Sequence, residues 1–289
     1  MSEVIQLEGI NKSYDRFELR DITVGIKEGY ITGLIGPNGA GKTSLIQMIM
    51  GMVYPDQGEI QLFGQNHLLH QAAIKDRIGY VSDENIYYER LTVKQMKAII
   101  APFYSRWNED VYQKYQERFK LPPDKKIKDL SKGMKIKFSL AIALSHDADL
   151  LIMDEPTSGL DPIFRRELLE LLSEHIQDEK KSILFSTHNT MDLDRIADYI
   201  VFINDGRLVF NEMKESLTEK YLLVKGGREL LDRDVRRWFI GIRETAVGFE
   251  GLIGNRAEGE RYFKDTAICE IPTLEEIMYF TVKGSEAHA

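Results

Sequence analysis

Short apolar runs recur along the first 211 residues and are separated by polar or glycine-rich segments. Continuous apolar runs of this length predict buried strands, and runs that alternate apolar with polar positions predict half-buried strands. The continuous runs are residues 31–35, 78–81, 150–153 and 182–186, and the alternating ones are 4–7, 22–26 and 58–63. The alternating runs, together with 31–35, suggest antiparallel strands that frame the glycine-rich turn after residue 35.

Apolar residues at helical spacing fill the intervals between these strands. Thr92, Asn108 and Ser131 are residue types that cap helices. We expect the helices to cover residues 92–107, with Pro102 kinking or dividing the first, then 108–120 and 136–144. Residues 85–146 are therefore predicted to form a helical subdomain inserted between strands.

The remainder of the main domain continues this alternation. A helix begins at residues 158–162, another is expected over 191–197, and Asp205-Gly206 predicts a hairpin turn between strands 199–204 and 207–211. We therefore assign residues 1–211 to one α/β domain.

Residues 212–289 predict a smaller α+β region. Residues 221–224 fit a strand, 229–240 a charged amphipathic helix and 272–279 a final helix. A segment of this size is marginal as an independent core, so we expect it to dock on the main domain.

A phosphate-binding loop connects the strand 31–35 to the next helix. Its spacing fits G-x-x-x-x-G-K-[ST], in which glycines let backbone N–H groups approach phosphate at a helix N-terminus. The lysine reaches the β/γ-phosphates and the following hydroxyl is placed on Mg²⁺. The expected nucleotide contacts are Gly36, Pro37, Asn38, Gly39, Ala40, Gly41, Lys42, Thr43 and Ser44.

Three further polar residues follow buried strands. Asp154 and Glu155 end the run 150–153, and His188 lies just past the run 182–186. Nucleotide sites of open α/β sheets lie at the carboxyl ends of strands, so these residues are candidates for metal and water chemistry. A solvated turn at Asp154-Glu155 and a structural role for His188 are the alternatives.

Composition narrows the class of protein. The 289 residues are 43% hydrophobic and 29% charged, which is typical of a globular protein, and the net charge of −8 disfavours a nucleic-acid partner. The N-terminus has no secretory pattern, and no apolar run reaches the ~18 residues that a membrane span needs. The single cysteine, Cys269, suits a reducing cytosol. Membrane contact would therefore go through a partner.

The ordered motifs resemble the nucleotide-binding subunit of ATP-binding-cassette (ABC) transporters. These are Tyr14 as the base-stacking aromatic, the loop 36–43, 130–134 (LSKGM) where the family has LSGGQ, the run 150–155, the loop 158–161 and His188. The resemblance implies a P-loop NTPase core of ABC type with an antiparallel β subdomain, a helical subdomain and a C-terminal appendage. On the residues alone, Tyr14 could equally pack within the fold.

The resemblance also implies the roles of the site residues. ATP would lie between the phosphate loop of one chain and Ser131 and Gly133 of a second ABC subunit. Asp154 would hold Mg²⁺ through water, Glu155 would polarise the attacking water and His188 would orient it. Family members act on a separate integral membrane permease, which implies a cytoplasmic protein at the inner face of the membrane. The C-terminal appendage and the sequence of residues 154–162 most resemble those of bacterial exporters of drugs and antimicrobial peptides.

Two positions depart from the family pattern. Asp83, with Glu84 beside it, stands where the family has a glutamine that touches Mg²⁺ and the water. An aspartate still offers carboxylate oxygens to Mg²⁺ but adds negative charge. Lys132 and Met134 replace a glycine and a glutamine of LSGGQ, and Lys132 either approaches phosphate or points to solvent. The alternatives to a transport ATPase are a nucleotide-gated docking module with weak hydrolysis and an ABC ATPase unconnected with transport.

Overall fold

A computed structural model describes residues 2–82, 84–178 and 180–288. Asp83 therefore lies outside the described residues. The strands are β1 (Glu3–Tyr14), β2 (Phe17–Lys27), β3 (Ile31–Ile35), β4 (Gln57–Leu62), β5 (Gln65–Asn66), β6 (Ile78–Val81), β7 (Leu150–Asp154), β8 (Ser182–Thr187), β9 (Tyr199–Asn204), β10 (Arg207–Met213), β11 (Leu222–Gly226), β12 (Phe239–Glu244), β13 (Phe249–Ile253) and β14 (Ile268–Glu270).

The helices follow the same order along the chain. They are α1 (Lys42–Ile49), α2 (Gln71–Lys75), α3 (Val93–Ile100), α4 (Glu109–Arg118), α5 (Lys132–Ser145), α6 (Pro162–His175), α7 (Thr190–Ile196), α8 (Lys214–Lys220), α9 (Arg256–Phe263) and α10 (Leu274–His288). Among the described residues, no helix combines the length and the apolar character needed to cross a bilayer.

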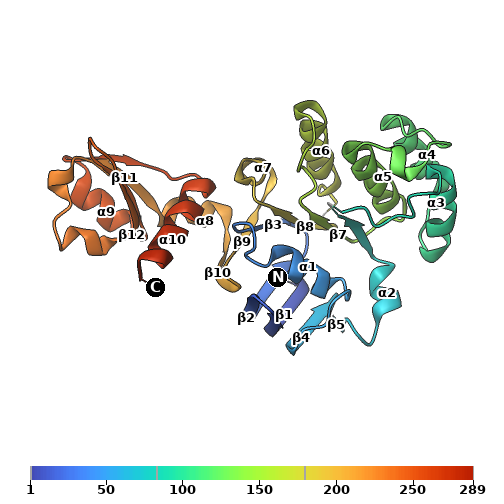
Figure 1. Ribbon diagram of the computed structural model, residues 1–289, viewed down its shortest axis with the longest axis horizontal. Coiled ribbons are helices and arrows are strands. Elements are labelled where there is room, and N and C mark those ends of the chain that lie inside the picture. Colours follow the sequence, from blue (N-terminus) through green and yellow to red (C-terminus); the bar gives the residue numbers. More distant parts are fainter. Residues whose placement is uncertain (1, 83, 179, 289) are drawn as a thin grey trace.

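A six-stranded sheet in the order β10-β9-β3-β8-β7-β6 forms the centre of the molecule (Figure 1). Strands β9, β3, β8, β7 and β6 are parallel, and only β10 runs antiparallel, to β9. A strand buried on both faces must be apolar at consecutive positions, which explains the continuous runs in the sequence. The predicted strand 31–35 is confirmed, but it belongs to this sheet and not to the antiparallel one.

The two faces of the central sheet are covered differently. Alternate side chains of one strand point to opposite faces, so Leu150 and Ile152 of β7 join one core while Leu151 and Met153 join the other. The first core is closed by α1 and by an antiparallel sheet in the order β2-β1-β4-β5. The second core is closed by the helices between α3 and α7.

Side-chain caps start several of the helices, as the sequence predicts. Thr92 accepts the N–H of Gln95 and the Gln95 side chain accepts the N–H of Thr92, which together form a capping box. Asn108 caps α4 and Ser131 caps α5. The first helix ends at Ile100 and a 3₁₀ turn over Ala101–Phe103 follows. The helix predicted over 92–107 therefore ends early, near Pro102, and only this 3₁₀ turn continues it.

The C-terminal region contains a third sheet, in the order β12-β13-β11-β14. It docks as expected, because Leu274, Ile277 and Phe280 of α10 are buried in the core cluster that also contains Leu193 of α7. Figure 1 shows α10 on the side of this region that faces the central sheet. The boundary at residue 211 stays a prediction.

One expectation in this region is wrong. Residues 229–240 do not form a helix but contain 3₁₀ turns over Arg228–Leu230 and Val235–Trp238, and β12 begins at Phe239. The carboxylate of Asp232 accepts the N–H groups of Asp234 and Val235, and this local pairing competes with helical hydrogen bonds. Aromatic and β-branched residues after Trp238 then favour the strand that pairs with β13.

The capping box of α3 gives a test of this local architecture. Removing the Thr92 hydroxyl leaves the N–H of Gln95 without its partner, so Thr92→Ala should destabilise the chain by about 1 kcal/mol. Thermal unfolding should show this as a Tm lower by about 2–4 °C. Thr92→Ser keeps the hydroxyl and is the matched control, and equal Tm values for the two variants would contradict the role of the cap.

Candidate functional site

The phosphate loop occupies the turn between β3 and α1. Gly41 precedes α1 with φ of +106°, in the left-handed region that favours glycine. A Cβ atom at Gly36 would lie 2.2 Å from the backbone oxygen of Ile203, so this position also excludes larger residues. The sequence folds into a tight loop here because both positions lack side chains.

Lys42 is buried beneath this loop. Its Nζ donates to the carbonyl oxygens of Gly36 at 2.8 Å and Pro37 at 3.4 Å, and lies 3.7 Å from Oε1 of Glu155. Burial lowers the pKa of Lys42 from its ordinary value, and the nearby charges of Glu155 and Asp154 oppose that shift. The loop therefore holds a cation with little access to water.

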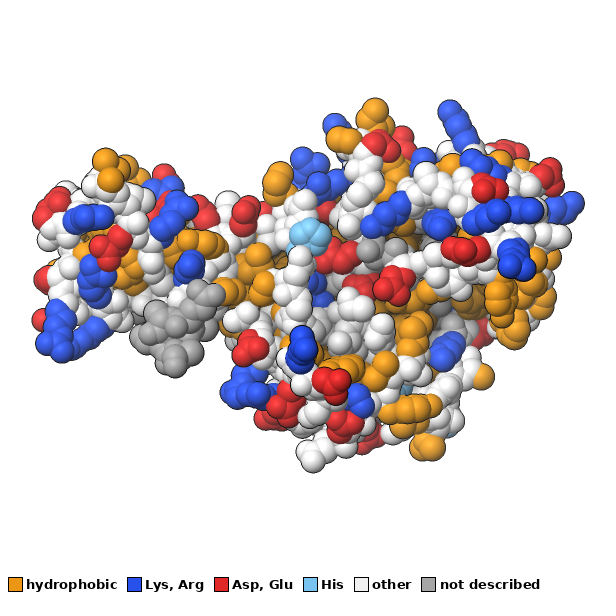
Figure 2. All heavy atoms as spheres, in the orientation of Figure 1, with side chains coloured by type: hydrophobic (Ala, Val, Ile, Leu, Met, Phe, Trp, Pro, Cys, Tyr) orange, Lys and Arg blue, Asp and Glu red, His pale blue; other side chains and the backbone are white. Residues whose placement is uncertain are grey.

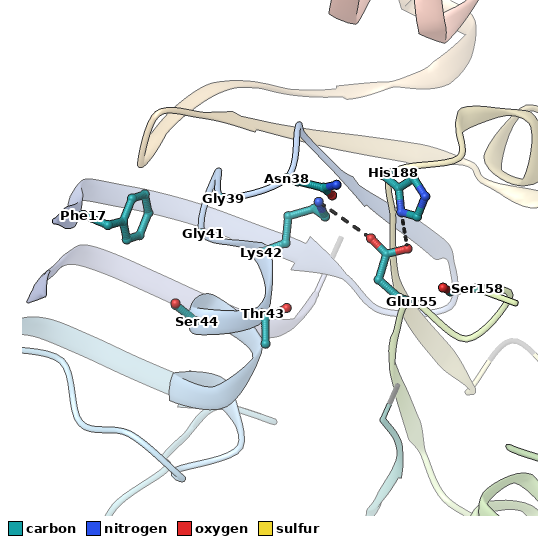
Figure 3. A pocket seen from close by; sticks show the side chains of 10 residues that line it. All are labelled: Phe17, Asn38, Gly39, Gly41, Lys42, Thr43, Ser44, Glu155, Ser158 and His188. Carbon is teal, nitrogen blue, oxygen red and sulfur yellow. Dashed lines mark hydrogen bonds and ion pairs between the residues drawn. The ribbon is translucent and has the colours of Figure 1, made fainter. Parts of the chain in front are cut away.

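Glu155 lies at the centre of the site (Figure 3). Its carboxylate reaches Lys42 through Oε1 and Nδ1 of His188 through Oε2, the latter at 2.8 Å. Its backbone has φ of +48°, which is uncommon outside glycine, and its N–H donates to the backbone oxygen of Ser186 at 3.1 Å. The end of β8 thus holds Glu155 in the conformation that aims its side chain at both partners.

Asp154 is the last residue of β7 and is buried beside Glu155. Its Oδ1 accepts the hydroxyl of Ser186 at 2.5 Å. A buried carboxylate is costly unless hydrogen bonds or cations satisfy it, and the Ser186 contact meets part of this need. Among the described residues, no cluster of three or more His, Cys, Asp or Glu side chains could hold a metal by itself.

A cleft of about 430 Å³ opens over these groups. Its lining includes eight residues that the sequence predicts for the site: Asn38, Gly39, Gly41, Lys42, Thr43, Ser44, Glu155 and His188. These residues come from three distant segments, which follow β3, β7 and β8. The arrangement can hold a polyanion beside Lys42 and present a carboxylate to a water molecule.

Two lining residues were not among the predicted site residues, namely Phe17 and Ser158. Tyr14 pairs with Phe17 across the β1–β2 hairpin, with ring centroids 6.2 Å apart, but only Phe17 is part of the lining. The sequence signal that could have identified Phe17 as a site residue is its position three residues after Tyr14, at the same end of the hairpin. The stacking role of Tyr14 stays a prediction.

The other predicted residues that the structure describes do not line the cleft. Gly36, Pro37 and Ala40 belong to the backbone of the loop, while Ser131 and Gly133 lie at the start of α5. Lys132 is exposed, and its Nζ lies 3.4 Å from the Oγ of Ser158, at the edge of the cleft. The side chain is therefore exposed to solvent, and its approach to phosphate stays a prediction.

Comparison with protein families assigns the fold to a known class. A family model described as "ABC transporter" matches residues 19–158, and one described as an AAA domain matches residues 125–192. A solved "ATP binding subunit of ABC transporter" covers 74% of this chain and 91% of its own, with a TM-score of 0.68 and 27% identity. The predicted fold class is confirmed.

Curated relatives match most of the chain. "ABC transporter ATP-binding protein YtrB" of Bacillus subtilis is 30% identical over 245 residues, which is 84% of this chain and 82% of the relative. "Bacitracin transport ATP-binding protein BcrA" of Bacillus licheniformis is 31% identical and covers 77% and 74%. "Nod factor export ATP-binding protein I" of Rhizobium sp. is 31% identical and covers 77% and 75%. The chain therefore belongs to the ATP-binding, ATP-hydrolysing subunits of ABC transporters.

Proposed function

We propose that this chain powers export by closing with a second cassette around ATP and driving a separate membrane permease. The observation that carries the proposal is the Glu155 carboxylate, which lies between Lys42 and His188 at the open edge of the central sheet. Relatives named for bacitracin transport and Nod factor export support the direction of transport.

The contacts of Glu155 support its role as the group that activates water. Its Oε2 meets Nδ1 of His188 at 2.8 Å, which fixes one carboxylate oxygen and orients the other toward Lys42. A positioned carboxylate that accepts a proton from water accelerates hydrolysis by about 10²–10⁴-fold. Lys42 holds the β/γ-phosphates, and His188 keeps Glu155 and the water in line.

Magnesium fits the donors near the phosphate loop. Mg²⁺ is usually bound by one or two carboxylates together with water and substrate phosphate, so it does not need a cage built wholly from protein. The Thr43 hydroxyl and the Asp154 carboxylate would supply protein oxygens, and the predicted third ligand, Asp83, lies outside the described residues. The ion would neutralise charge on the phosphates, while Ser186 keeps Asp154 oriented.

The start of α5 supports a contact with ATP held by the second cassette. Ser131 caps this helix through the N–H of Met134, so its side chain lies at the positive end of the helix dipole. Ser131 and Gly133 are outside the cleft of their own chain, which leaves them available to a facing chain. Lys132 adds a positive charge beside them.

A second surface supports contact with the permease. A groove of about 280 Å³ lies between β6 and the helical segment, lined by Met50, Ile78, Tyr80, Ile86, Tyr87, Met96, Ile100 and Tyr104 among others. Ile86, Tyr88 and Phe103 nearby are exposed. Figure 2 shows hydrophobic side chains gathered below α3 and beside α2. A cytoplasmic segment of the permease would cover this groove and hold the chain at the inner face of the membrane.

Replacing the water-activating carboxylate tests the reaction directly. Glu155→Gln should release phosphate about 10²–10⁴-fold more slowly, because an amide cannot take up the proton, while still binding Mg-ATP. The variant should accumulate as a dimer, measured by light scattering during gel filtration. Glu170→Gln, which changes an exposed carboxylate paired with Arg166, is the control. Wild-type rates in Glu155→Gln would remove the assignment.

The buried lysine predicts a dependence on pH. Phosphate binding needs protonated Lys42, and its lowered pKa means that deprotonation begins below the range of an exposed lysine. The affinity for a fluorescent ATP analogue should therefore fall, as the pH is raised, at a lower pH than an exposed lysine would require. Lys42→Arg stays charged over this range, so it should bind with a smaller change in affinity, and equal changes for the two chains would contradict the prediction.

A substitution in the groove should weaken binding of the membrane partner without changing ATP hydrolysis. Ile86→Asp places a charge in the apolar lining and should lower retrieval of an integral membrane protein from the host about tenfold or more. Phosphate release by the isolated chain should stay within about twofold, because the groove lies outside the ATP cleft. Val247→Asp changes an equally apolar but distant exposed residue and is the control. Equal retrieval by both variants would exclude this surface.

A further inference from the structure

The position of His188 depends on the helix that follows it. His188 lies between the end of β8 at Thr187 and the start of α7 at Thr190, with Asn189 as the cap of the helix. Its side chain is 51% exposed, so surrounding packing restrains the ring only in part. The backbone that enters α7 therefore decides whether Nδ1 reaches Glu155.

Helix α7 is too short to hold that position alone. It has seven residues, and isolated helices below ~12–15 residues are marginal in water. Leu193 holds α7 against β3, because its side chain packs so closely on Gly33 that a Cβ atom there would lie 2.5 Å from it. Asp192 fixes it from the side, where its Oδ1 meets Nε of Arg165 on α6 at 2.7 Å.

The C-terminal region supplies two more contacts to the same helix. Helix α10 packs against α7, and its buried residues Ile277 and Phe280 share one core cluster with Leu193. Lys214, at the start of α8, donates from Nζ to the backbone oxygen of Asp194 at 2.9 Å. Both contacts come from residues beyond the strands of the central sheet.

We propose that the C-terminal region, through α10 and through Lys214 of α8, positions α7 for ATP hydrolysis and so keeps His188 on Glu155. The inference rests on the proposed role of His188. The rate of ATP hydrolysis would then depend on whether the C-terminal region is docked on α7. Any change that displaces α10 from α7 would slow the reaction.

The geometry also defines which kinetic constant should change. The Nζ atom of Lys42 is held by the carbonyl oxygens of Gly36 and Pro37. These residues belong to the loop that follows β3 and not to α10. Loosening α10 should therefore leave the KM for ATP within about twofold and reduce kcat, because the His188–Glu155 pair that it weakens aligns the reacting groups.

Two buried phenylalanines of the C-terminal region form a matched pair for the test. Phe280 belongs to the cluster shared with α7, whereas Phe263 of α9 belongs to a separate cluster within the C-terminal region. Both are almost fully buried, at 1% and 0% exposure. Steady-state phosphate release by Phe280→Ala, Phe263→Ala and wild-type chains, with far-ultraviolet circular dichroism as a check of folding, separates contact with α7 from general damage.

We expect Phe280→Ala to lower kcat about tenfold at a nearly unchanged KM, and Phe263→Ala to keep kcat within about twofold. Phe280→Leu should recover most of the rate. An equal decrease in both alanine variants, or a decrease in neither, would overturn the proposal.

A surface variant keeps the test decisive if Phe280→Ala fails to fold. Lys214→Met removes the hydrogen bond to Asp194 without opening a cavity, and it should lower kcat about two- to threefold at an unchanged KM. A wild-type kcat in this variant would then overturn the proposal. A wild-type kcat in His188→Ala would instead remove the role of His188, on which the inference depends.

Discussion

Parallel pairing of β3, β7 and β8 is the constraint on which the site depends. The register places Ile35 beside Thr187 and Asp154 beside Ser186, so three strands end at one edge. Parallel strands reach this arrangement only through crossover connections, which here carry the helices that cover one face of the sheet. The phosphate loop, Glu155 and His188 are neighbours because of that register.

The charges at this edge stabilise one another in a partly dry environment. Lys42 is 7% exposed and Glu155 16%, so their attraction is screened less than at the surface. Breaking such a pair leaves a buried charge without compensation, which is why single substitutions here act strongly. The same edge remains open above Glu155, where a water and a phosphate can enter.

The C-terminal region is joined to this chemistry by apolar packing. Leu274, Ile277 and Phe280 extend the core that already contains α7 and the central sheet, while Phe263 and its neighbours form a core of their own. The region therefore has enough internal packing to hold its sheet together. Two of its elements contact α7: α10 packs on that helix, and Lys214 at the start of α8 donates to the backbone oxygen of Asp194. Helix α7 begins just after His188.

The sequence by itself determined the local elements of the cassette and the chemistry of the phosphate loop. Residues 31–35 and 150–153 are apolar at every or almost every position, which predicts strands buried on both faces of a sheet. Gly41 and Lys42 stand at the positions that a phosphate-binding loop requires. Tertiary structure alone decided that Phe17 and not Tyr14 lines the cleft, that residues 229–240 are not helical and that α10 reaches α7. These depend on which strand pairs with which and on contacts between distant segments, and neither is encoded in the period of hydrophobic positions.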